Sequence, residues 1–183
     1  MNDLDDNLRD VARYGNAIQL KAALAHPKCD PKFIDRLGQT ALIHTAYGGR
    51  AECVQMLIPV SDPWVKDDEG ATALMYAAFR GFDKCVQWLV PVSNVLEQDH
   101  EGMTALMHAA NMGHLSCVQL LLPKSDVRAQ SVEGLNAADF ASFRGHFEVT
   151  SFMAASACAS AEMQILQATT GPGSLGKSGF LRV

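Results

Sequence analysis

A glycine recurs at a fixed interval of 32 residues along most of this 183-residue chain. It opens four segments, at Gly38, Gly70, Gly102 and Gly134, and a second glycine follows eleven residues later in each of them. A Thr-Ala-Leu triplet begins two residues after the opening glycine in the first three segments. Such a period indicates a linear array of similar units in which each unit contacts mainly its neighbours. An array of this kind favours a binding surface over an enclosed catalytic pocket.

Each unit is predicted to contain two short helices separated by a tight turn. In the third unit Leu106, Ala109 and Ala110 have the i, i+3, i+4 spacing of a short helix, and Thr104 precedes them where an N-cap residue belongs. The second glycine suits the left-handed turn that ends this helix. A second helix follows, and a proline stops it in the first three units. A polar finger then leads to the next opening glycine.

These units resemble the ankyrin repeats. The family signature Thr-Pro-Leu-His-x-Ala corresponds to Thr-Ala-Leu-Met-Tyr-Ala at residues 72–77 and to Thr-Ala-Leu-Met-His-Ala at residues 104–109. The match covers about residues 7–155 and includes a diverged first unit. The resemblance implies an all-α fold, an ankyrin-repeat solenoid of about five helix-turn-helix repeats with connecting fingers.

Two departures from the signature affect local packing. Ala41, Ala73 and Ala105 stand where the family has proline, and these alanines still favour a helix. The signature histidine, which in the family makes a hydrogen-bonded tie near the turns, is replaced by Ile43, Met75 and Met107. We therefore expect apolar packing in place of that tie.

The chain is predicted to divide into an array and a tail. Residues 1–168 form the ankyrin-repeat array, with an N-terminal diverged repeat and a C-terminal helical cap, and residues 169–183 form a flexible Gly/Ser-rich tail. The stop proline is Ala155 in the last unit, so we expect helix from about Phe147 to about Gln167. An apolar stripe of this helix should cover the end of the stack, and its members are Cys158, Ala161, Ile165 and Leu166.

Composition argues against nucleic-acid and membrane partners. The net charge is −5, and no basic run could follow a phosphate backbone. No apolar run approaches the ~18 residues that a membrane helix needs. The acidic N-terminus lacks the order of a signal peptide. We therefore expect a cytoplasmic protein.

The cysteines and histidines do not form a predicted redox or metal centre. Cys53, Cys85 and Cys117 share one repeat position, and stacked helices lie roughly 8–10 Å apart, whereas a disulfide needs Cα atoms within about 7 Å. These cysteines are expected to be reduced core residues. His44 and His108 lie two repeats apart, too far to share a metal ion. We expect no metal, no cofactor and no enzymatic activity.

One short motif points to a different class of protein. Residues 171–178 satisfy Gly-x-x-x-x-Gly-Lys-Ser, the pattern of a phosphate-binding loop. That loop needs a following helix, and only five residues remain in this sequence. We interpret the match as accidental. A nucleotide-hydrolysing enzyme is the alternative, and ATP or GTP binding would reveal it.

The resemblance implies a non-enzymatic protein–protein interaction module, a scaffold or adaptor that binds a partner protein on the concave ankyrin surface. An alternative is a regulatory segment or subunit of a larger enzyme such as a protein kinase. Family partners commonly contact the finger tips and first helices. Carried over position by position, the expected partner-binding residues are Leu37, Gln39, Tyr47, Asp68, Glu69, Phe79, Arg80, His100, Glu101, Met103, Asn111, Met112, Val132, Glu133, Leu135, Phe143 and Arg144.

Three expectations concern the character of that surface. Met103 and Met112 should be exposed contact residues, because flexible thioethers suit adaptable surfaces. The aromatic residues Tyr47, Phe79 and Phe143 could belong to the core or to the contact surface. A basic segment of the partner is the implied ligand, attracted by a negative edge that consists of Asp67, Asp68, Glu69, Asp99, Glu101 and Glu133.

Overall fold

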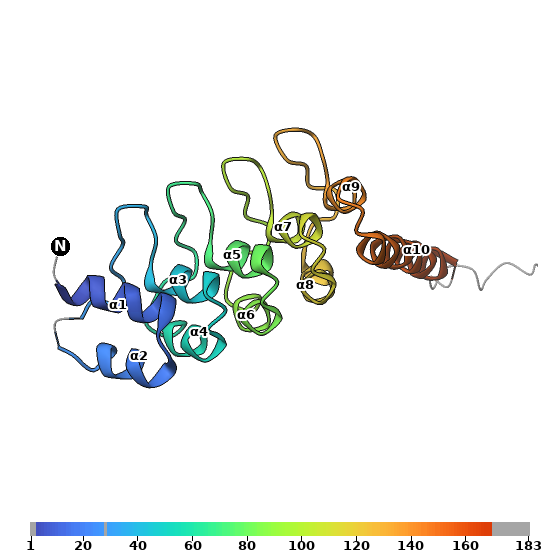
Figure 1. The fold of residues 1–183 in the computed structure, drawn as a ribbon. Helices are drawn as coiled ribbons and strands as arrows, with labels where there is room; N and C mark the ends of the chain where they lie inside the picture. Colours follow the sequence, from blue (N-terminus) through green and yellow to red (C-terminus); the bar gives the residue numbers. More distant parts are fainter. Residues whose placement is uncertain (1–2, 28, 170–183) are drawn as a thin grey trace, which may run out of the picture.

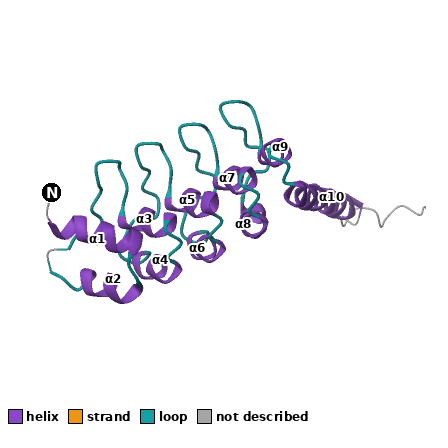
Figure 2. Ribbon diagram, viewed as in Figure 1, coloured by secondary structure: helices purple, strands orange, loops and turns teal. Residues whose placement is uncertain are grey.

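The computed structural model describes residues 3–27 and 29–169, and all regular elements in these residues are helical apart from one isolated bridge (Figures 1 and 2). The elements are α1 Asp3–Tyr14, α2 Ala17–Leu24, α3 Ala41–Tyr47, α4 Ala51–Leu57, α5 Ala73–Arg80, α6 Asp83–Leu89, α7 Ala105–Asn111, α8 Leu115–Leu121, the 3-10 turn η1 Leu122–Lys124, α9 Ala137–Phe143 and α10 Phe147–Thr169.

The helices form two rows. The inner helices α1, α3, α5, α7 and α9 pack one against the next, and the outer helices α2, α4, α6 and α8 do the same. Four fingers project from one side of the array (Figure 1). We number them first to fourth, and they are residues 34–40, 66–72, 98–104 and 130–136. This arrangement confirms the predicted all-α solenoid of helix pairs and fingers.

One apolar core runs along the array between the two rows. Leu42, Leu74 and Leu106 of the inner helices are buried, and so are the Cys, Val and Leu positions of the outer helices. Cys85 and Cys117 are free thiols within this core. Burial raises the pKa of Cys85 to about 11 and that of Cys117 to about 12. These thiols therefore stay protonated and act as small apolar side chains, as predicted.

The glycine after each inner helix joins two neighbouring units. Gly81 has φ 74°, a left-handed conformation that ends α5. A Cβ atom at this position would lie 2.5 Å from the ring of His114 in the next unit. The Nε2 atom of His114 in turn donates to the carbonyl oxygen of Phe79 at 3.1 Å. The missing side chain is therefore what allows the ring to reach the preceding helix.

Backbone hydrogen bonds hold the fingers side by side. The amide of Asp68 donates to the carbonyl oxygen of Leu37 at 3.1 Å, and the amide of His100 donates to that of Glu69 at 3.0 Å. The amide of Val132 donates to the carbonyl oxygen of Glu101 at 2.8 Å. Each finger thus has a fixed position relative to the one before it.

The last helix is longer than the others and leaves the stack. The expected helix from about Phe147 to about Gln167 is present as α10, which has 23 residues. Val149 and Met153 are buried where α10 packs on α8 and α9, and its far end runs beyond the array (Figure 1). Cys158 is exposed, so its assignment to a covering stripe is wrong. The side chains of the other stripe residues lie outside the described part.

Two further expectations concern membrane helices and the C-terminal tail. Among the described residues, no helix has the length and apolar character needed to cross a membrane. Residues 170–183, which include the phosphate-loop match at 171–178 and almost all of the predicted tail, lie outside the described residues.

We predict that Gly81→Ala destabilises the protein more than Gly145→Ala. Both glycines have left-handed backbones, φ 74° and 75°, so both substitutions should cost about 1–2 kcal/mol in backbone strain. Only Gly81 faces a ring, whereas an added Cβ at Gly145 meets nothing within 4 Å. The clash with His114 should add ~1–3 kcal/mol. Urea unfolding followed by circular dichroism measures both changes, and equal losses would contradict the proposed role of the ring contact.

Candidate functional site

The surface formed by the fingers and the inner helices is hollowed between consecutive fingers. We call this surface the concave face. A cavity of about 430 Å³, the middle cavity, lies between the second and third fingers, and a cavity of about 750 Å³, the distal cavity, lies between the third and fourth. The middle cavity is lined by Asp68, Glu69, Ala71, Met75, Tyr76, Phe79, Asp99, His100, Glu101 and His108. The distal cavity is lined by His100, Glu101, Met103, Asn111, Ser131, Val132, Glu133, Leu135, Phe140, Phe143 and Arg144.

A buried aspartate sets the shape of the second finger. One carboxylate oxygen of Asp67 accepts the backbone amides of Glu69 at 3.1 Å and Ala71 at 2.9 Å, which closes the turn at the finger tip. The other oxygen accepts the hydroxyl of Tyr76 in α5 at 2.6 Å and the side-chain amide of Gln39 at 3.0 Å. Asp67 therefore joins its own finger, the following helix and the first finger.

The first and third fingers use an aspartate and a histidine in the same way. The Nε2 atom of His44 lies 2.9 Å from the Asp35 carboxylate, and that of His108 lies 2.7 Å from the Asp99 carboxylate. Burial alone would raise the pKa of Asp35 and Asp99, but backbone amides and the histidine ring outweigh it and hold both pKa values below the ordinary value. Burial lowers the pKa of His44 despite its carboxylate partner.

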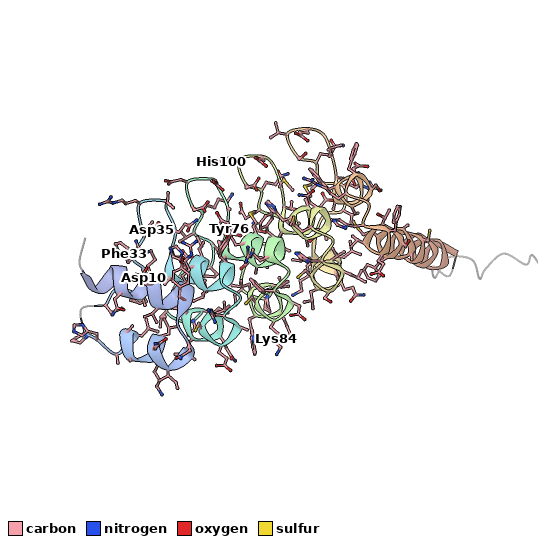
Figure 3. All side chains as sticks on the ribbon, viewed as in Figure 1. Asp10, Phe33, Asp35, Tyr76, Lys84 and His100 are labelled. Atoms are coloured by element: carbon pink, nitrogen blue, oxygen red, sulfur yellow. The ribbon has the colours of Figure 1, made fainter. Side chains whose placement is uncertain are left out.

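These contacts correct two sequence-based expectations. Asp67 and Asp99 belong to the finger turns, so they do not contribute to an exposed negative edge. Met75 and its equivalents are buried in apolar packing, as expected. That packing does not replace the hydrogen-bonded tie to the finger, however, because a tie is also present. The tie comes from the next residue, at Tyr76, which Figure 3 labels, and at the equivalent residues His44 and His108. The sequence signal was an aspartate repeated nine residues before each of these rings.

The fourth finger is built differently. Ser131 replaces the aspartate, and its hydroxyl accepts the amide of Leu135 at 3.4 Å. Phe140 occupies the helix position that His108 has in the preceding unit and lines the distal cavity. Both partners of the tie are replaced together, so the fourth finger has no buried aspartate that would need a hydrogen-bonding ring, and Phe140 adds an aromatic side chain to the wall of the distal cavity.

The expected partner-binding residues differ widely in exposure. Only Met103 is buried. Five are half-buried, namely Gln39, Tyr47, Phe79, Asn111 and Leu135. The exposed ones are Leu37, Asp68, Glu69, Arg80, His100, Glu101, Met112, Val132, Glu133, Phe143 and Arg144.

Met103 was expected to be an exposed contact residue, and this expectation is wrong. Its side chain is 6% exposed and belongs to the apolar core, whereas Met112 is 41% exposed. Gly102, with φ 74°, turns the chain back toward α7 just before Met103, and the Met103 amide donates to Asp99 at 2.8 Å. The turn therefore directs the residue after the tip glycine inward. Ala71, at the same position of the second finger, is also buried.

The aromatic positions divide between packing and exposure. The ring of Tyr47 lies 5.7 Å from that of Tyr76 in an edge-on contact, and Phe79 contacts His108 in the same way at 5.9 Å. Both rings therefore pack on the next inner helix. Phe143 holds the same position in α9 and is 77% exposed, because no further inner helix follows α9 among the described residues.

No metal site is found among the described residues. No group of three or more His, Cys, Asp and Glu side chains in the described residues could hold a metal ion. Figure 3 shows His100 at the third finger, on the opposite side of the array from Lys84 of the outer row. The concave face has two cavities with mixed polar and apolar linings and exposed carboxylates at the finger tips.

Comparison with known proteins identified one family. A model of ankyrin repeats, which describes three copies, matches residues 8–99 and residues 83–164. Together these matches run from α1 into α10. The search of curated proteins found no match.

We predict that Asp99→Ala costs about 1.5–3 kcal/mol of stability at neutral pH, whereas Asp68→Ala costs less than ~0.5 kcal/mol. Asp99 accepts two backbone amides and contacts the His108 ring, while Asp68 is exposed at the finger tip. The pKa of Asp99 is lower in the folded protein than its ordinary value of 3.8. Its contribution should therefore be complete above that value and disappear as the pH falls through the lowered pKa.

Urea unfolding of both variants at a series of pH values from neutral to strongly acidic tests this prediction. The stability gap between the wild-type protein and Asp99→Ala should narrow only on the acidic side. A gap of the same size at every pH would show that the charge of Asp99 does not stabilise the finger.

We also predict that Met103→Ala lowers the free energy of unfolding by about 2 kcal/mol, because it removes a core side chain. Met112→Ala should lower it by less than ~0.5 kcal/mol, since the side chain is largely in solvent. Thermal or urea unfolding compares the two methionines directly. Equal effects would place Met103 outside the core.

Proposed function

Because the chain belongs to the ankyrin repeat family, whose members are generally protein–protein interaction modules, we propose that it is a non-enzymatic scaffold or adaptor that binds a partner protein on its concave face. The observation that carries the proposal is the pair of cavities in register between consecutive fingers. Both have walls of mixed apolar and polar side chains, which suits recognition of a protein segment.

The charge of this face supports a partner with a basic segment. Glu69, Glu101 and Glu133 occupy the same position on the second, third and fourth fingers, and all three are exposed. Asp68 adds a fourth exposed carboxylate beside Glu69. Such a row of negative charge attracts and orients a basic partner, and the attraction weakens as salt increases.

We propose that the protein resides in the cytoplasm, a reducing compartment, because its core cysteines are unpaired. Cys53, Cys85 and Cys117 are buried as free thiols at successive layers of the stack. Unpaired thiols are typical of proteins that stay in the cytosol.

We predict that a triple substitution on the fingers, Glu69→Gln, Glu101→Gln and Glu133→Gln, weakens partner capture at least about tenfold, as expected when several charge pairs are lost. The matched control is Gln55→Lys, Gln87→Lys and Gln119→Lys, which makes the same change in net charge on exposed positions of the outer helices. The control should capture the partner as the wild-type protein does.

Affinity capture from cell extract with quantitative mass spectrometry gives the measurement, repeated at low and physiological salt. Proteins that depend on the finger glutamates should be lost from the finger variant and should bind less at the higher salt. If the outer-helix control loses the same proteins, the concave face is not the binding surface.

A further inference from the structure

The middle and distal cavities are two copies of one site, displaced by one repeat. Glu69, Phe79 and Asp99 of the middle cavity correspond to Glu101, Asn111 and Ser131 of the distal cavity, at an interval of 32 residues. His100 and Glu101 line both cavities, so the third finger forms a wall that the two share. Differences between the copies therefore indicate what each one selects.

The middle cavity is suited to a cationic side chain. Its exposed charged residues are Asp68, Glu69 and Glu101, and no lysine or arginine lines it. Asp99 is engaged with its finger amides and with His108, so the exposed carboxylates are the ones available to a ligand. Phe79 supplies an aromatic wall, against which the stem of an arginine side chain can pack.

The distal cavity is suited to a large apolar side chain. Val132 replaces His100 of the middle cavity and is 78% exposed, and Phe140 replaces His108. Phe143, 77% exposed, stands at its rim. Arg144 adds a positive charge to the lining that also contains Glu133, and its Nε atom donates to the side chain of Asn111 at 3.0 Å. Apolar side chains of the fourth finger and α9 thus line this cavity, and the positive charge of Arg144 partly offsets its negative charge.

We propose that the two cavities receive one extended partner segment, with an arginine or lysine in the middle cavity and a large apolar side chain in the distal cavity three residues away. The separation follows from the layers of the array, which lie roughly 8–10 Å apart. An extended polyproline-II segment has three residues per turn and rises about 3.1 Å per residue, so side chains three apart share a face at about 9 Å. This inference rests on the proposed function and specifies its ligand.

Synthetic peptides test the proposal without knowledge of the natural partner. Each probe is a fluorescein-labelled twelve-residue peptide of Gly, Ser and Pro with one Arg and one Phe, separated by one to eight positions and made in both orders. Fluorescence anisotropy with the full chain at low salt gives the affinities. We expect the tightest binding at a separation of three, in one of the two orders, and at least tenfold weaker binding when either Arg or Phe is replaced by Ala.

Two protein variants test which cavity binds the Arg side chain and which binds the Phe side chain. Asp68→Asn with Glu69→Gln should weaken the Arg–Phe peptide about tenfold and leave a peptide that carries only Phe unchanged. Val132→Ser with Phe143→Ser should do the reverse, with an effect on Phe-containing peptides and none on a peptide that carries only Arg. All four positions are exposed, so circular dichroism should show unchanged folding.

Three results would overturn the proposal. Affinity that is the same at every separation would show that the cavities do not act as a pair, and an optimum at seven would indicate a helical ligand. If both variants weakened the binding of all peptides equally, the middle cavity would not be specific for Arg nor the distal cavity for Phe. If the finger glutamates still govern capture of whole proteins, any of these results would reject the two-cavity ligand and leave the proposed function standing.

Discussion

The concave face depends on the hydrogen bonds of one aspartate carboxylate, which is buried at the base of each of the first three fingers. In the first three fingers an aspartate accepts two backbone amides from the tip and meets a ring on the following inner helix. Burial of such a charge is costly unless every acceptor position is used, and here the finger turn supplies the donors. The turn, the helix and the orientation of the exposed glutamates are therefore fixed together.

Stacking extends this local order along the array. The ring of His114 occupies the space that a side chain at Gly81 would fill, and the finger amides bond from each unit to the one before it. These contacts join positions about one repeat apart, so the cavities between fingers have walls of defined spacing. A surface made in this way holds its shape before a ligand arrives, which reduces the conformational entropy lost on binding.

The repeat period predicted the helix pairs, the fingers and the buried cysteines, because these follow from spacing alone. It could not predict that Met103 is buried, since the residue after a tip glycine is directed inward by a left-handed turn that depends on Asp99. Phe79 and Phe143 share one position, yet one is packed and the other exposed, because in the described part of the chain only the first is followed by another inner helix. Exposure at one repeat position thus depends on place in the stack, which a single unit does not encode.

The contacts between neighbouring units also bear on how such a chain can change in length. Asp68 bonds to Leu37, His100 to Glu69 and Val132 to Glu101, each time across the same interval. A tandem duplication of one 32-residue unit between the first and fourth fingers would therefore insert a layer whose donors and acceptors are already matched on both sides. The protein could gain a finger and a cavity in a single event without disturbing the ends, so its binding surface can grow by whole units.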